Sequence, residues 1–287
     1  MLLVAVLAGP GGSNCTYLPP IEAPAPPAVA ASPEPHPSFE QLQQEVADLI
    51  EQAGATGGVS LVELGGAQAQ SWSTNGDTKF AAASTYKLPL LMEEAQLLAT
   101  GKERDSQLVC YESGDWEDGW YTDYQPGLCY TRAELIRRIG LKSDNTAAHM
   151  LVRDEGWTEA LNRYAGRHGA RASAFYYPNV TTSNDLAGLW VDEANGNAGG
   201  SRAQGRLYPL LTHTAYEDGI PAGVPAAATV VHKVGSLDGQ VNDAGLVMGG
   251  PQGAYVLAIC TQGPGAEEGW KLVADISRAV WEFESTR

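Results

Sequence analysis

The architecture of this chain follows first from residues 229–261, which read TVVHKVGSLDGQVNDAGLVMGGPQGAYVLAICT. Three short apolar runs stand here between glycine-containing turns: Thr229–Val234, Gly245–Met248 and Tyr255–Thr261. Apolar runs of this length, bounded by turn residues, are typical of buried strands. We therefore expect three strands of one sheet in this stretch.

Two more strands are expected near the other end of the chain. Val59–Leu64 and Ala69–Ser73 flank Gly65-Gly66, which is a hairpin signal. The residues between the two groups of strands show mainly helical spacing, and the expected helices are Thr131–Ile139, Asn145–Val152, Thr158–His168 and Asn184–Asp192. The economical fold class is α+β with two lobes: one antiparallel five-stranded sheet, and an all-helical lobe inserted between its second and third strands.

Terminal helices are expected to cover this sheet. Ser38 and Gln41 form a capping box at the start of a helix over Ser38–Gly54. Apolar residues repeat at helical spacing from about Glu267 to Phe283. We expect one domain over residues 38–287, with an α/β lobe over 38–80 and 226–287 and the helical lobe over 81–225.

The first 37 residues have a different composition. The apolar run Leu2–Ala8 is too short to span a bilayer but is typical of a signal peptide, although no basic residue precedes it. Residues 16–37 are rich in Pro and Ala, which indicates a semi-extended linker. Residues 1–15 are therefore interpreted as a signal or lipoprotein-like segment. We expect export to the cell envelope or beyond, and lipidation of Cys15 stays open.

The charge balance excludes some classes of partner. The chain has 18 Lys and Arg against 34 Asp and Glu, a formal net charge of −16. Nucleic acids and anionic membranes attract clustered basic residues, so neither is an expected partner. No CxxC pair and no His spacing typical of a metal site occurs, so no metal or cofactor is expected. We expect a monomer without a transmembrane span.

Cysteines frame one segment of the middle region. Cys110 and Cys129 flank a stretch rich in Gly, Asp and aromatic residues. In an oxidising compartment they are expected to form a disulfide, and two free thiols are the alternative. Cys260 lies in an apolar run and is expected to be buried and inert. Four aromatic side chains of the framed stretch either stack on a substrate or pack onto the helical lobe: Trp116, Trp120, Tyr121 and Tyr124.

Ser84 and Lys87 form the first motif that carries chemistry. Residues three apart share one face of a helix, so the two side chains are expected to touch. A buried Lys with a lowered pKa can take the proton of a serine hydroxyl and make it a nucleophile. The pair alone is a weak signal, because a serine N-cap followed by an exposed lysine gives the same pattern.

Two further motifs follow in the chain. Ser143-Asp144-Asn145 stands before one expected helix, where Ser143 or Asp144 would otherwise serve only as a cap. Lys233-Val234-Gly235 lies on a late strand, where it would otherwise mark only a turn. Each motif has this simpler explanation. All three in this order and spacing point to one site.

Together the three motifs resemble class A β-lactamases and their penicillin-binding relatives, the serine-type D-Ala-D-Ala peptidases. The resemblance extends from about residue 38 to the end, and includes TRAEL ahead of SDNTAA. It implies an α/β lobe, a helical lobe and an acyl-serine intermediate. By this resemblance Ser84 is the nucleophile, Lys87 its partner in proton transfer, and Ser143 a shuttle for a proton towards the leaving nitrogen.

The resemblance also implies four residues that bind substrate. Asn145 would hold the substrate amide and fix Lys87, and Lys233 would supply positive charge for a substrate carboxylate. The backbone N–H groups of Ser84 and Ser236 would form an oxyanion hole. Gly235 would let the substrate backbone approach the strand.

Three departures from the family pattern bear on the substrate. Class A enzymes release the acyl group with a loop glutamate, whereas no Glu or Asp occurs between Ala165 and Asn184. Val234 replaces the family threonine, and no Arg occurs on the strand after Lys233, where Asn242 and Asp243 stand instead. Two histidines lie near the motifs. His149 is expected to pack, and His232 is expected at a strand edge.

These observations favour an exported serine acyl-hydrolase that acts on a D-Ala-D-Ala-type peptide or a related amide or ester, with slow deacylation of β-lactams. A class A β-lactamase is the first alternative. A non-catalytic module that binds peptidoglycan is the alternative from another class.

Overall fold

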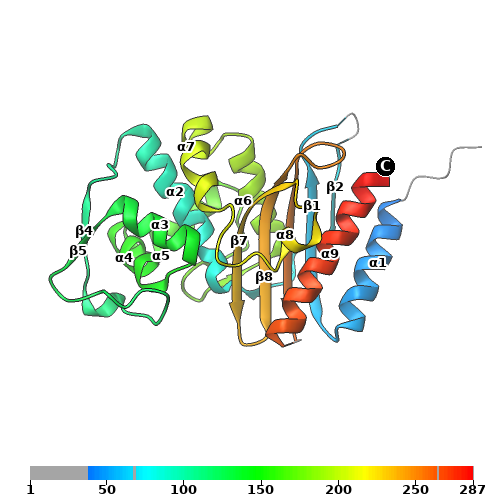
Figure 1. Ribbon diagram of the computed structural model, residues 1–287, viewed down its shortest axis with the longest axis horizontal. Helices are drawn as coiled ribbons and strands as arrows, with labels where there is room; N and C mark the ends of the chain where they lie inside the picture. The colour runs from blue at the N-terminus through cyan, green and yellow to red at the C-terminus, as the bar shows by residue number, and fades with distance from the viewer. Residues whose placement is uncertain (1–37, 67–68, 264, 287) are drawn as a thin grey trace, which may run out of the picture. The chain divides into compact units, whose positions relative to one another are not determined.

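A five-stranded antiparallel sheet lies at the centre of the fold (Figure 1). The computed structural model describes residues 38–66, 69–263 and 265–286, so the expectations for residues 1–37, including Cys15, lie outside the described residues. The strand order is β2-β1-β9-β8-β7. The strands are β1 (Thr56–Glu63), β2 (Ser71–Thr74), β7 (Thr229–Leu237), β8 (Gln240–Met248) and β9 (Tyr255–Gln262). All five were expected from the sequence.

Helices α1 (Phe39–Gln52) and α9 (Ala266–Thr286) pack together on the outer face of the sheet (Figure 1). The capping box is confirmed, because the side chains of Ser38 and Gln41 each accept a hydrogen bond from the other residue's backbone N–H. The apolar residues of α1 and α9 form one core layer with the apolar residues on the outer face of the sheet. The short helix α8 (Ile220–Gly223) joins this layer against α9.

Helix α6 (Ser183–Ala194) covers the inner face of the sheet. It packs on β1, β8 and β9, and its fully buried Trp190 donates a hydrogen bond from Nε1 to the carbonyl of Ala244 at 2.9 Å. The second core layer therefore runs from the sheet into the helices beyond α6. Helix α6 therefore packs with the sheet as well as with the helical lobe. The lobe bounds inferred from the sequence remain a prediction.

The other helices follow the expected order. Helices α3 (Arg132–Lys142), α4 (Asn145–Asp154) and α5 (Trp157–Arg167) match three predicted ranges, and α2 (Lys87–Thr100) follows the 3-10 turn η1 (Ala83–Tyr86). Several short elements were not expected from the sequence: α7 (Gly200–Leu207), α8, the turns η2 (Ser113–Asp115) and η3 (Tyr208–Leu210), and the strand pairs β3 (Phe80–Ala81) with β6 (Val180–Thr181) and β4 (Leu108–Cys110) with β5 (Cys129–Thr131). Elements of two to eight residues are too short to carry a clear periodic pattern.

The expected disulfide is present between Cys110 and Cys129. It joins β4 to β5 and closes residues 110–129, which we call the disulfide-closed segment. Cys260 is buried in β9, as expected. Within the described residues, no helix combines the length and apolar character needed to cross a membrane.

Candidate active site

Ser84 and Lys87 meet where η1 passes into α2. The spacing of three residues places Lys87 Nζ 3.0 Å from Ser84 Oγ, so the contact expected from the sequence is confirmed. Lys87 is fully buried, and its amine also lies 2.6 Å from the carbonyl oxygen of Ser143 and 2.5 Å from Asn145 Oδ1. The amine is therefore held by oxygen atoms of Ser84, Ser143 and Asn145.

Ser143 lies in the sharp connection between α3 and α4. Its backbone is left-handed, with φ 55° and ψ 34°, and the next residue, Asp144, caps α4 by accepting from the N–H of Ala147. This turn directs Ser143 towards both amines of the site. Its Oγ lies 3.4 Å from Lys87 Nζ and 2.9 Å from Lys233 Nζ.

Strand β7 forms the opposite wall and brings Lys233 and Gly235 to η1. Lys233 is almost fully buried and also donates to the carbonyl of Val234 at 2.8 Å. A Cβ atom on Gly235 would lie 2.7 Å from the carbonyl oxygen of Ala82 and 2.9 Å from the amide nitrogen of Ser84. By the family resemblance, Gly235 was expected to let a substrate backbone approach the strand. The structure shows that the backbone approaching it is the protein's own.

Burial lowers the pKa of both amines. Burial is the main cause that lowers the pKa of Lys87 to about 7, against the opposing charges of Glu117 and Asp144. Burial, together with the charge of Lys87, also holds the pKa of Lys233 well below its usual range. Two ammonium groups are unfavourable in one buried site, so a proton can be accepted here near neutral pH.

Two pockets adjoin Ser84. The larger, of about 470 Å³, is also lined by Ser143, Asn145, Gly235, Ser236 and the side of the disulfide-closed segment that carries Asp118 and Trp120. The smaller, of about 260 Å³, is lined by Ser84 together with Glu117, His149, Tyr176 and Asn179. The predicted site residues therefore come together, with Lys87 and Lys233 buried behind the pocket walls. Among the described residues, no cluster of His, Cys, Asp or Glu is arranged to hold a metal ion.

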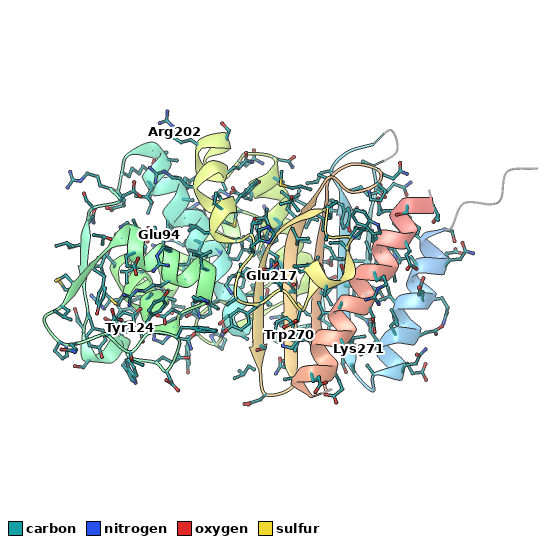
Figure 2. All side chains as sticks on the ribbon, in the orientation of Figure 1. Glu94, Tyr124, Arg202, Glu217, Trp270 and Lys271 are labelled. Atoms are coloured by element: carbon teal, nitrogen blue, oxygen red, sulfur yellow. A yellow bond between two sulfur atoms is a disulfide. The ribbon has the colours of Figure 1, made fainter. Side chains whose placement is uncertain are left out.

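The aromatic residues of the disulfide-closed segment divide between the two expected roles. Trp120 lines the larger pocket and donates from Nε1 to the hydroxyl of Tyr216 at 2.8 Å. Tyr124 (Figure 2) is buried and donates to Asp144 Oδ1 at 2.6 Å. Tyr121 packs under the guanidinium of Arg138, 4.2 Å from the ring centre. Trp120 thus borders the larger pocket, while Tyr121 and Tyr124 fasten the segment to the helices.

His149 makes two polar contacts besides the packing expected of it. Its Nδ1 lies 3.1 Å from the carbonyl oxygen of Asp115, and its Nε2 lies 3.0 Å from Glu117 Oε2. The ring also packs edge-on against Tyr176, with the ring centres 5.2 Å apart, as expected, and the two polar contacts were not expected. They arise because the disulfide-closed segment folds back over α4. The position of His149 one turn after Asn145, on the same helix face, was the only sequence feature that could have indicated its closeness to the site. Glu117 was missed altogether, since nothing local links it to Ser84.

His232 lies on β7, the edge strand of the sheet, as expected, and it is buried there. Its Nδ1 lies 2.9 Å from Asp243 Oδ1, and its Nε2 lies 3.3 Å from Glu217 (Figure 2). Burial alone would lower the pKa of His232, but the two carboxylates outweigh burial and raise it to about 9. Asn242 donates to the carbonyl of Ala81 at 2.8 Å. Asn242 and Asp243, which stand where relatives often place an Arg, thus hold the fold together.

The stretch that would carry the family's loop glutamate presents other groups to the site. Tyr176 and Asn179 line the smaller pocket, and Asn179 Nδ2 donates to the carbonyl of Ala83 at 3.2 Å. The nearest acidic residue along the chain, Asp185, accepts from Ser173 and from the N–H of Ala172. It is occupied within the fold and does not line either pocket.

Residues 41–283 match the model Beta-lactamase2, described as the beta-lactamase enzyme family. The match covers most of the chain, so the chain belongs to this family, whose members are serine hydrolases.

Solved structures agree. PBP-A is similar at 26% identity and a TM-score of 0.79, over 86% of this chain and 97% of that chain. A point mutant of PBP-A, solved as an acyl-enzyme complex with penicillin G, is similar at 27% identity and a TM-score of 0.78, over 86% and 97% of the two chains. A beta-lactamase from Sphaerobacter thermophilus follows at 25% identity and 0.76, over 86% and 98%. No curated protein sequence matches the chain.

Proposed function

We propose that this protein is an exported, monomeric serine acyl-hydrolase that acts on a D-Ala-D-Ala-type peptide, or on a related amide or ester, through an acyl-serine intermediate. One observation carries the proposal. The amine of Lys87 is fully buried, lies 3.0 Å from Ser84 Oγ, and has its pKa lowered to about 7. That arrangement gives a serine hydroxyl a base at neutral pH.

The arrangement supports the following acylation step. Ser84 Oγ attacks the substrate carbonyl carbon while Lys87 takes the hydroxyl proton. The N–H groups of Ser84 and Ser236 stabilise the negative charge that develops on the carbonyl oxygen. Ser143, which touches both amines, gives its proton to the leaving nitrogen and regains one from Lys87 or Lys233.

Substrate binding is assigned to Asn145, Lys233, Gly235 and Ser236. Asn145 holds Lys87 through Oδ1 and is placed to meet a substrate amide in the larger pocket. A substrate carboxylate near Lys233 would raise the lowered pKa of that amine and restore its charge. Val234 adds no hydroxyl to this contact, which weakens the selection for a carboxylate and favours esters or altered termini as further substrates.

Deacylation of a β-lactam is proposed to be slow. Between Ala165 and Asn184 no carboxylate is present to activate water, and Asn179 and Tyr176 face Ser84 instead. The penicilloyl ester would then outlast the acylation step by a wide margin. The signal-like segment and the Pro- and Ala-rich linker of the sequence support export to the cell envelope or beyond, and lipidation of Cys15 stays open.

A class A β-lactamase is the second candidate. It is favoured by the similarity to the Sphaerobacter thermophilus beta-lactamase, and by the carboxylate of Glu117 in the smaller pocket. A non-catalytic module that binds peptidoglycan is favoured by Val234 and by the missing loop glutamate. The contact between Ser84 and a buried lysine opposes it, because a pure binding module gains nothing from a base next to a hydroxyl.

Intact-mass spectrometry with benzylpenicillin tests these alternatives. We expect one adduct per wild-type chain that persists for minutes or longer, and no adduct on Ser84→Ala. An adduct lost within seconds would identify an efficient β-lactamase. No adduct on the wild type, with unchanged binding of muropeptide by Ser84→Ala, would identify the binding module.

A further inference from the structure

We propose that Glu117 is the general base that activates water to hydrolyse the acyl-enzyme, and that His149 positions its carboxylate. This inference rests on the acyl-serine intermediate proposed above. It assigns the step for which the family's loop glutamate is missing to a residue of the disulfide-closed segment.

The fold fixes the backbone of Glu117 next to the catalytic helix α4. Its N–H donates to Thr146 Oγ1 at 3.1 Å, and the Thr146 hydroxyl donates back to its carbonyl at 2.8 Å. Asn145 Nδ2 donates to the carbonyl of Asp118 at 2.9 Å. Asn145 also accepts from Lys87, so the segment and the amine beside Ser84 share one support.

His149 fixes the direction of the Glu117 side chain. Both ring nitrogens of His149 face oxygen atoms that can only accept: Nδ1 lies 3.1 Å from the carbonyl oxygen of Asp115, and Nε2 lies 3.0 Å from Glu117 Oε2. A ring that makes both hydrogen bonds carries a hydrogen on each nitrogen. The hydrogen bond from His149 is the main cause that lowers the pKa of Glu117. The carboxylate is therefore ionised at neutral pH but weakened as a base, which is consistent with slow release.

The carboxylate opens into the same pocket as the nucleophile. Of the described residues that line the pocket of about 260 Å³ at Ser84, Glu117 alone carries a carboxylate. Its side chain is 52% exposed, so water reaches it without a conformational change. Its charge also acts on the buried amine of Lys87, whose pKa it raises against the effect of burial. Glu117 is thus electrostatically coupled to the site.

The proposed step balances as follows. Glu117 takes a proton from water as the water oxygen bonds to the acyl carbonyl carbon. The tetrahedral intermediate then collapses, and the bond from that carbon to Ser84 Oγ breaks. Lys87, which has taken up a proton from solvent in the acyl-enzyme, gives that proton to Oγ and is left as the neutral amine that the next acylation needs, while Glu117 releases its proton to solvent. The net change is one water consumed and one carboxylic acid released.

The neighbouring Asp118 is the natural competitor, since it lines the larger pocket. Its Oδ1 accepts from the N–H of Gly119 at 3.1 Å, and no described histidine contacts it. Glu112 offers a matched control on the same segment. It is exposed, pairs with Arg153, and lines neither pocket.

The test separates acylation from release, using benzylpenicillin and a thioester of an N-acyl-D-alanine as acyl donors. Adduct formation and loss are followed by intact-mass spectrometry in the wild type and in Glu117→Gln, Asp118→Asn and Glu112→Gln. We expect Glu117→Gln to acylate within about twofold of the wild type and to release at least about 100-fold more slowly, the usual effect of losing a general base. Glu112→Gln should match the wild type in both steps.

His149 is tested through its coupling to Glu117. We expect His149→Ala to slow release without slowing acylation, and the double variant His149→Ala/Glu117→Gln to release no more slowly than Glu117→Gln alone. A merely structural role would slow acylation as well and would add to the effect of the first substitution.

Several results would overturn the inference while leaving the proposed function intact. These are a wild type that acylates but never releases, a Glu117→Gln variant that releases at the wild-type rate, one that loses acylation instead, or an equal loss of release in Asp118→Asn. A wild type that forms no adduct with either donor would overturn the proposed function itself.

Discussion

Lys87 shows how burial turns an ordinary side chain into a reagent. An exposed lysine is protonated at neutral pH and cannot accept a proton. Here desolvation lowers the pKa to about 7, while Asn145 and the carbonyl of Ser143 keep the amine in place. The same Ser-x-x-Lys pattern in an exposed turn would leave the lysine protonated and unable to act as a base.

The rate of acylation is predicted to follow this pKa. The neutral amine is the base, so the rate constant for acylation should fall below pH 7 and reach a plateau above it. The measurement is the rate of adduct formation with benzylpenicillin between pH 5 and pH 9. A rate that does not change over this range would show that Lys87 does not act as the base. Lys87→Arg, whose guanidinium keeps its proton, should be at least about 100-fold slower throughout.

The disulfide-closed segment is the element that most distinguishes this site. It supplies Trp120 to the larger pocket and Glu117 to the smaller one. It is fastened by Tyr124 on Asp144, and by Arg153, which pairs with Asp115. The disulfide at its base limits how far these contacts can open.

Removal of the disulfide is predicted to destabilise the protein. In Cys110→Ser/Cys129→Ser the unfolded chain regains the freedom of a loop with a sequence separation of 19 residues. By the chain-entropy argument the free energy of unfolding should fall by about 3 kcal/mol. Urea titration measures it. A reductant should destabilise the wild type equally and leave the double variant unchanged, and an equal free energy in the two proteins would contradict the prediction.

The packing of the whole molecule makes its stability depend on pH in two opposing ways. His232, buried between Asp243 and Glu217, has its pKa raised from 6.5 to about 9. Its contribution is therefore complete below pH 6.5 and is lost as the pH rises through 9. Lys87 and Lys233 have lowered pKa values, so their unfolded forms bind more protons and their effect on stability rises with pH.

The difference in the free energy of unfolding between the wild type and His232→Gln isolates the contribution of His232. We expect the free energy of unfolding of the wild type, relative to His232→Gln, to decrease between pH 6.5 and pH 9, since the variant lacks this titration but keeps both lysines. Urea titrations at half-unit steps give the two curves. A constant difference over this range would show that His232 is not protonated in the folded protein.

Much of the fold was predictable because its long elements carry periodic patterns. The five sheet strands, helices α1, α3, α4, α5 and α9, and the positions of Ser84, Lys87, Ser143 and Lys233 all follow from local sequence. The contact of Ser84 with Lys87 depends only on helical spacing, so the sequence alone sufficed for it.

Other features depend on contacts between distant residues. Local sequence could not place α6 on the sheet, bury His232 between two carboxylates, or bring Glu117 from the disulfide-closed segment to Ser84. In each case the partners are far apart along the chain, and only the packed structure brings them within range of a hydrogen bond or of a shared charge. Local sequence was therefore enough to predict the five sheet strands, the long helices and the contact of Ser84 with Lys87. Only the tertiary structure lowers the pKa of Lys87 and brings Glu117 into one pocket with Ser84, because the first depends on burial and the second on distance in space.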